Sequence, residues 1–109
     1  MMFSFVVPAY NAERSIRSCL DSILVQTFSD FEIVVINDGS TDSTLEILKE
    51  YLKKEKKLHV YSFKNSGVSI TRQRGINLSN GEYIILVDSD DTVNPNLLEK
   101  LYTVICEHN

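Results

Sequence analysis

Apolar runs and helix-like periodicities alternate along the whole chain. Four short runs are apolar on both faces, as expected for strands buried within a parallel sheet; they lie at residues 3–7, 31–36, 58–63 and 83–87. Between and after these runs, apolar residues that recur at intervals of three and four predict helices near residues 16–24, 43–52 and 95–105, and a less amphipathic helix is expected at 67–78. This alternation favours a three-layer α/β/α fold, in which helices cover both faces of an open parallel sheet of about four strands.

Residues that favour helix ends stand beside these periodic segments. Asn11 or Ser15 is available to cap the first helix, and the sequence STLE at 43–46 has the form of a capping box. Asn80-Gly81 suits the end of the third helix, and Asn94-Pro95 suits the start of the fourth. We therefore expect short polar turns between the strands and the helices.

Composition narrows the class of protein. The 109 residues are 43% hydrophobic and 24% charged, which is ordinary for one small globular domain. A net charge of -4 argues against nucleic-acid binding, because phosphate neutralisation requires a clustered basic surface. The one dense basic run, KKEKK at 53–57, falls at a predicted helix end, where we interpret it as solvated.

Two further observations bear on the compartment. No apolar stretch approaches the roughly 20 residues of a membrane-spanning helix, and the N-terminus lacks the basic region of a signal peptide. Cys19 and Cys106 fall on apolar faces of predicted helices without metal-ligand spacing, so we predict that both are buried free thiols. These features indicate a cytoplasmic chain.

Polar segments follow each predicted strand. They are PAYN at 8–11, NDGSTD at 37–42, KNSG at 64–67 and DSDD at 88–91. In an open parallel sheet all four segments lie along the carboxyl edge, where such sheets bind ligands in the crevice at which strand order reverses. A common order places the first strand between the second and the fourth, so that PAYN and DSDD would flank this crevice.

The DSDD segment carries the strongest chemical signal. A purely structural interpretation of this segment is a helix-capping turn, because Asp favours caps and turns. However, Asp88 and Asp90 stand at the tip of a buried strand, where each carboxylate would lose hydration unless paired, and no Arg or Lys lies nearby in sequence. A hard divalent cation, Mg²⁺ or Mn²⁺, would satisfy both carboxylates.

The other candidates have two interpretations each. Asp38 could accept hydrogen bonds from a ligand or belong to a strand-to-helix turn, and Tyr10 could stack on a base or lie in the core. Arg72 and Arg74 could be solvated, or they could supply positive charge to a diphosphate near the carboxyl edge.

These segments, in this order, resemble the N-terminal half of family 2 glycosyltransferases, which are inverting enzymes of the GT-A fold. The resemblance covers about the whole chain in three blocks: FSFVVPAYN, SILVQTFSDFEIVVINDGSTDST at 22–44, and GVSITRQRGINLSNGEYIILVDSDD at 67–91. Asn37, Thr71 and Gln73 depart from the residues most frequent in the family, which affects the finer nucleotide contacts more than the overall assignment.

The resemblance implies a nucleotide-sugar donor, most commonly a UDP-sugar, held with Mn²⁺ or Mg²⁺. It implies that Asp88 and Asp90 form the metal motif, with Asp90 the more direct ligand and Asp88 near the ribose. It also implies that the donor contacts residues at matching positions: Pro8, Ala9, Tyr10, Glu13, Asp38, Arg72, Asp88 and Ser89. Asp38 would accept a hydrogen bond from the base, and Arg72 would lie near the base or the phosphates. The acceptor would be a glycan or a lipid-linked molecule, as in the biosynthesis of polysaccharides or cell-envelope glycans.

The resemblance also implies what the chain lacks. In the family the general base and the acceptor site follow the DxD segment at a distance, so we expect residues 1–109 to be the donor-binding part, without the acceptor part and without a catalytic residue of its own. A longer parent could associate with the cytoplasmic face of a membrane. A nonenzymatic sugar-nucleotide-binding or regulatory module remains the alternative, ahead of a receiver domain, which needs a fifth strand, and of a glycosidase, which needs a second, separated carboxylate.

Overall fold

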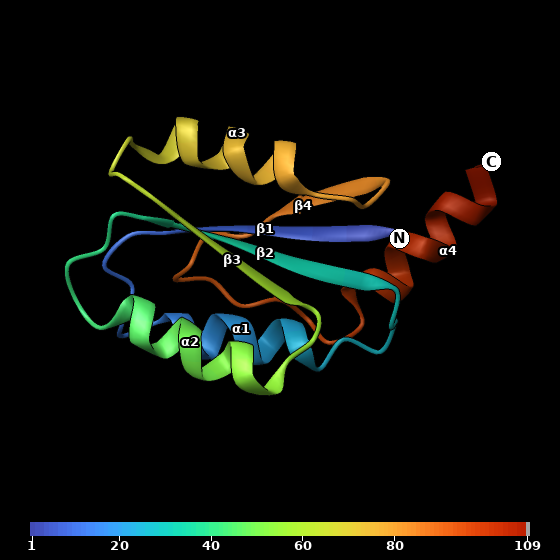
Figure 1. Ribbon diagram of the computed structural model, residues 1–109. Coiled ribbons are helices and arrows are strands. Elements are labelled where there is room, and N and C mark those ends of the chain that lie inside the picture. Colours follow the sequence, from blue (N-terminus) through green and yellow to red (C-terminus); the bar gives the residue numbers. More distant parts are fainter. Residues whose placement is uncertain (109) are drawn as a thin grey trace.

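The computed structural model describes residues 1–108 and contains the predicted alternation of strands and helices (Figure 1). The elements in chain order are β1 (Phe3–Ala9), α1 (Ile16–Leu24), β2 (Phe31–Asp38), α2 (Thr44–Lys54), β3 (Leu58–Phe63), α3 (Val68–Leu78), β4 (Tyr83–Leu86) and α4 (Leu97–His108).

The four strands form one parallel sheet in the order β3-β2-β1-β4. The first strand therefore lies between the second and the fourth, as predicted, and Phe3 pairs with Phe31 on one side and with Tyr83 on the other. Strands β1 and β2 are buried along almost their whole length, whereas the edge strands β3 and β4 are only partly covered. The reversal of strand order on either side of β1 puts a crevice at its carboxyl end.

Helices cover the two faces of the sheet unequally. Helices α1 and α2 lie on one face and α3 lies on the other, so the three-layer prediction is confirmed (Figure 1). The main core lies on the α1 and α2 side, where alternate residues of β1 and β2 pack against Ile16, Leu20, Ile23 and Leu48. Only alternate residues reach this core because successive side chains of a strand point to opposite faces of the sheet.

Helix α3 approaches the sheet closely because its buried face is made of small residues. Thr71 and Gly75 are its buried positions, and a side-chain carbon at Gly75 would collide with Cγ1 of Val6. This packing explains the weak amphipathic pattern of the segment, since a helix that approaches through a glycine does not need a wide apolar stripe.

Two predicted helix caps are wrong. Asn11 does not cap α1: it adopts a φ of 49°, and its side-chain oxygen accepts hydrogen bonds from the backbone N–H groups of Thr41 and Asp42. Ser15 stands at the start of α1, but its side chain makes no capping bond. The physical reason is that the loop after β1 folds against the loop after β2, and this tertiary contact uses the Asn11 side chain.

The predicted capping box of α2 is also absent. Ser43 stands at the N-cap position without a side-chain cap, while the carboxylate of Asp42 accepts bonds from the N–H and the hydroxyl of Thr44. A carboxylate can make this charge-assisted bond at the positive end of the helix, so it displaces the serine.

The turn after α3 is stabilised by a buried carboxylate. Glu32 is 1% exposed, and its Oε2 accepts hydrogen bonds of 2.6 Å from the hydroxyl of Ser4 and of 2.6 Å from the backbone N–H of Asn80. Oε1 lies 3.3 Å from Nδ2 of Asn80 and 3.6 Å from Nε2 of His59. The Asn80-Gly81 turn follows the end of α3, as predicted. Asn80, however, donates its hydrogen bonds to Glu32 and does not cap the helix.

The two cysteines differ. Cys19 is buried and Cys106 is exposed, and both are free. The prediction is confirmed for Cys19 and wrong for the burial of Cys106, because α4 extends past the end of the sheet and only Leu98 of that helix is buried. Among residues 1–108, no helix combines the length and the apolar character needed to cross a bilayer.

Candidate functional site

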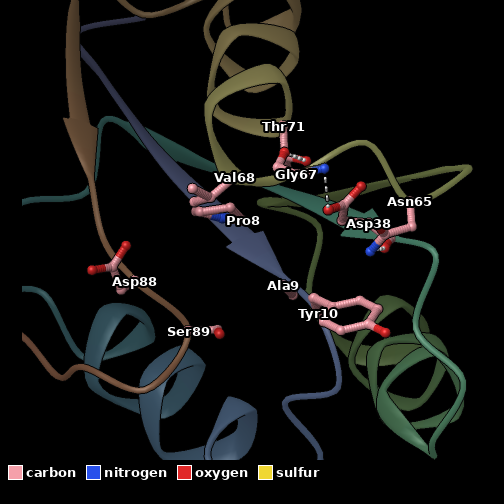
Figure 2. Close-up of a pocket in the computed structure, with 10 residues that line it drawn as sticks. All are labelled: Pro8, Ala9, Tyr10, Asp38, Asn65, Gly67, Val68, Thr71, Asp88 and Ser89. Atoms are coloured by element: carbon pink, nitrogen blue, oxygen red, sulfur yellow. Dashed lines mark hydrogen bonds between the residues drawn. The ribbon is translucent and has the colours of Figure 1, made fainter.

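A pocket of about 300 Å³ opens at the carboxyl end of β1 (Figure 2). The residues that line it lie at the ends of β1 and β2, in the loop before α3 and its first turn, and in the segment after β4. The lining residues are Pro8, Ala9, Tyr10, Asp38, Asn65, Gly67, Val68, Thr71, Asp88 and Ser89. Six of the eight predicted donor-contacting residues are among them, because the crossover connections bring the segments after the strands to one edge.

Tyr10 stands at the mouth of this pocket. It is 51% exposed, so the interpretation of a core tyrosine is wrong. Figure 2 shows its ring on the same side of the pocket as Asp38 and Asn65, with Asp88 and Ser89 across from them. An exposed aromatic face opposite polar groups is suited to stacking against a planar ring.

Asp38 has a structural task at the pocket wall. It is the last residue of β2 and is 4% exposed. Its Oδ1 accepts a 2.8 Å hydrogen bond from the N–H of Ser66, and its Oδ2 accepts a 3.1 Å bond from the N–H of Gly67. Both bonds fix the start of α3, and each oxygen keeps a second lone pair for a ligand donor.

Four lining residues were missed in the sequence analysis: Asn65, Gly67, Val68 and Thr71. The available signal was the polar segment KNSG, which follows β3 at the same edge. Gly67 has a φ of 93°, a backbone conformation that favours glycine. Side-chain Nδ2 of Asn65 donates to the carbonyl of Asp38, which ties this segment to the end of β2.

The acidic segment after β4 forms a compact cluster. Asp88, Asp90 and Asp91 are all exposed, and one carboxylate oxygen from each lies within 4.8 Å of the others. The premise that these carboxylates lose hydration is therefore wrong, and a turn exists as well, because the N–H of Asp91 donates to the carbonyl of Asp88. The geometry nevertheless fits a hard divalent cation, which takes oxygen ligands and keeps several waters.

A buried thiol lies beneath the acidic cluster. Sγ of Cys19 is 3.7 Å from the carbonyl oxygen of Asp88. Burial raises the pKa of this thiol to about 12, and the negative charges of Asp91, Asp90 and Asp88 add to the effect. The raised pKa keeps the thiol protonated at neutral pH, and the group of described residues placed to share one ion consists of the three carboxylates.

Arg72 pairs with the cluster from a different element. Its Nη2 lies 2.9 Å from Oδ1 of Asp88, and the two side chains are 38% and 51% exposed. No Arg or Lys lies near these carboxylates in the sequence, but α3 brings Arg72, 16 positions earlier, to the end of β4. Arg74 points elsewhere: its guanidinium lies over the ring of Phe63 and donates to the hydroxyl of Ser66.

Glu13 lies outside the lining of the pocket. Its Oε2 accepts a hydrogen bond from the N–H of Ser43, and its own N–H donates to Oδ2 of Asp42. These bonds hold the loop after β1, whose Tyr10 lines the pocket, against the loop after β2.

Comparisons with known proteins agree with this geometry. The family description "Glycosyl transferase family 2" matches residues 4–109. The chain is 44% identical to glycosyltransferase GlyA of Streptococcus pneumoniae, over 94% of this chain and 15% of GlyA. It is 40% identical to the glycosyltransferase YibD of Escherichia coli, over 95% of this chain and 30% of YibD.

Among solved structures, residues 1–349 of TarS from S. aureus in complex with UDP-GlcNAc superpose with a TM-score of 0.93 at 38% identity. This match covers 99% of the chain and 32% of the TarS chain. The fold is thus that of GT-A glycosyltransferases, and the chain spans less than a third of the two curated relatives and about a third of the TarS fragment.

Proposed function

The chain belongs to glycosyl transferase family 2, and from this premise we propose that its carboxyl-edge pocket binds the nucleotide-diphosphate sugar used in glycosyl transfer. A UDP-sugar is the preferred donor, since the TarS fragment at 38% identity is known in complex with UDP-GlcNAc. The single observation that carries the proposal is the pocket itself, with an exposed Tyr10 and a buried Asp38 at one end and Asp88 beside an acidic cluster at the other.

The proposal assigns the base of the nucleotide to the end formed by Tyr10 and Asp38. The tyrosine ring offers a stacking surface, and the free lone pairs of Asp38 accept an N–H of the base. Pro8 and Ala9 form the floor at the end of β1. Because Asp38 also fixes the start of α3, the position of this acceptor is held rigidly.

The opposite end of the pocket takes the ribose and the diphosphate. Asp88 and Ser89 line this end, and Asp88 with Asp90 would hold Mn²⁺ or Mg²⁺. When bound, the metal supplies Lewis acidity that neutralises the charge developing on the diphosphate leaving group. The residues of the chain bind and orient the donor so that the sugar carbon faces the acceptor.

The proposal divides the reaction between this chain and residues beyond it. Residues 1–109 form the donor-binding part, and transfer with inversion requires a general base that deprotonates the acceptor hydroxyl. We assign that base to no residue of this chain. The acceptor, a glycan or a lipid-linked molecule, would be bound by the remaining part of a longer, cytoplasmic enzyme.

Calorimetric titration of the purified chain with UDP tests the proposal. We expect weak, saturable binding that requires Mn²⁺ or Mg²⁺ and disappears with chelator, and we expect Asp90→Ala to weaken it at least about tenfold through loss of the metal. Asp30→Asn is the matched control, since Asp30 lies at the opposite end of β2, where it binds the N–H of Met2. UDP binding that is unaffected by chelator and by Asp90→Ala would refute the site.

The base-binding end needs a separate test. Asp38→Asn keeps the size of the side chain but only one of its two acceptor oxygens, so it loses one bond to the start of α3. Where circular dichroism shows a folded protein, it should weaken UDP binding more than it weakens inorganic diphosphate binding. Equal weakening of both ligands would contradict the assignment of the base to Asp38.

A further inference from the structure

The ion pair between Arg72 and Asp88 joins the pocket to the acidic cluster. Asp88 is the residue common to both: it lines the pocket (Figure 2), and it is one of the three clustered carboxylates. Arg72 holds its Oδ1 at 2.9 Å. The carboxylate that would serve as a metal ligand is thus engaged by a cation of the chain.

A divalent cation and the Arg72 guanidinium would compete for the negative charge of Asp88, although Arg72 contacts only its Oδ1. A metal within the cluster, whose oxygens lie within 4.8 Å of one another, would stand a few ångströms from the guanidinium. Two positive centres at such a distance repel, and solvent screens this repulsion only partly at a pocket wall. Occupation of the cluster by a metal therefore favours departure of Arg72 from Asp88.

Arg72 has unused capacity to bind an anion. Its Nε is buried without a hydrogen-bond partner among the described residues, although a buried N–H normally has one. Arg72 is not itself a lining residue, but its neighbour on the helix, Thr71, and its ion-pair partner, Asp88, both line the pocket. A phosphate group entering the pocket would offer acceptors that suit the guanidinium fork better than the single bond to Asp88.

We propose that Arg72 is a positioning residue that competes with the divalent cation for Asp88 and releases this carboxylate when the diphosphate of the donor takes the guanidinium. The proposal rests on the proposed function for the identity of the anion. It makes metal binding and nucleotide binding mutually dependent: each ligand favours the arrangement in which Arg72 has left Asp88. Because such coupling is reciprocal, UDP must raise the affinity for metal by the same factor as metal raises the affinity for UDP.

Titration of Mn²⁺ into the nucleotide-free chain, followed by electron paramagnetic resonance of the free ion, tests the competition directly. We expect Arg72→Gln to bind Mn²⁺ about three- to tenfold more tightly than the wild type, because it removes both an exposed ion pair and a nearby positive charge. A purely structural role for Arg72 predicts the opposite, a loss of metal affinity. Arg72→Lys, which keeps the charge, should stay within about twofold of the wild type.

Arg74→Gln is the matched control. Arg74 lies on the same helix and carries the same charge, but its partners are Phe63 and Ser66. We expect its Mn²⁺ affinity to change by less than about twofold. An equal gain in Arg72→Gln and Arg74→Gln would show a general charge effect and would overturn the competition, as would an unchanged or weakened affinity in Arg72→Gln.

The same titration with saturating UDP tests the release step. In the wild type UDP should increase the Mn²⁺ affinity by a larger factor than in Arg72→Gln, since the variant has no pair to release. Equal factors in the two proteins would overturn the release step. Failure of the wild type to bind UDP with Mn²⁺ would refute the proposed function and the release step together, whereas the nucleotide-free comparison would still decide the competition by itself.

Discussion

Replacement of Glu32 by Gln should reveal how much the buried carboxylate contributes to the stability of the fold. Glu32 accepts two hydrogen bonds of 2.6 Å, from Ser4 and from Asn80. Glutamine can keep both bonds, but only with a neutral acceptor, and its amide group would face Nδ2 of Asn80. Since a bond to a charged group contributes about 1 kcal/mol more than a neutral one, we expect a loss of about 2 kcal/mol, or about 8 °C in Tm.

The loss should depend on pH with a defined sign. Burial raises the pKa of Glu32, but the hydrogen bonds from Asn80 and Ser4 and the nearby His59 outweigh it and leave the pKa below its usual value of 4.5. A carboxyl group with a lowered folded-state pKa stabilises the protein above its unfolded pKa, and this contribution is lost as the pH falls through the folded pKa. The difference between Glu32→Gln and the wild type should therefore be full at pH 7 and shrink below pH 4.5.

Urea denaturation at a series of pH values measures this difference. Glu107→Gln is the control, because Glu107 is exposed on α4 and its replacement should change the free energy of unfolding by less than about 0.5 kcal/mol. A Glu32→Gln protein as stable as the control, or one whose deficit is the same at pH 7 and pH 3, would refute the reasoning.

Three other changes probe separate parts of the structure. Gly75→Ala should lower the free energy of unfolding in urea by about 1–3 kcal/mol, because its methyl group collides with Val6 of β1. Gln73→Ala, on the exposed side of α3, should not lower it. If the two variants were equally stable, α3 would be able to move away from the sheet. Asn11→Ala should lose about 2 kcal/mol through its positive φ and its two loop bonds, and a wild-type urea midpoint would contradict this. In the native protein at pH 8, a thiol reagent should modify Cys106 rapidly and leave Cys19 unmodified, because Cys19 is buried and its pKa is raised to about 12. Rapid modification of both cysteines would contradict the burial of Cys19.

The arrangement of the sheet could be predicted from the chain because it depends on local patterns and on general rules of topology. The segments of β1 and β2 are apolar on both faces, which indicated that these strands are buried. Right-handed crossovers between parallel strands then bring Tyr10, Asp38 and Asp88 to one edge of the sheet. No side-chain detail was needed for this step. It required only that polar residues follow each strand.

The contacts that could not be predicted are those made across elements. Arg72 reaches Asp88 because α3 packs closely through Gly75, and no local pattern encodes that approach. The Asn11 side chain serves a neighbouring loop and not its own helix, since a tertiary partner was closer. The exposure of Cys106 follows from how far α4 extends beyond the sheet. Apolar periodicity alone does not reveal that distance.

The most direct test of the account is the crystal structure or NMR mapping of this chain with UDP and Mn²⁺. We predict that UDP occupies the pocket with its base against Tyr10 and Asp38, that Mn²⁺ lies among Asp88 and Asp90, and that Arg72 has left Asp88 for the diphosphate. A UDP molecule bound elsewhere, or bound in this pocket with the base at Asp88 and the phosphates at Asp38, would contradict the central claim.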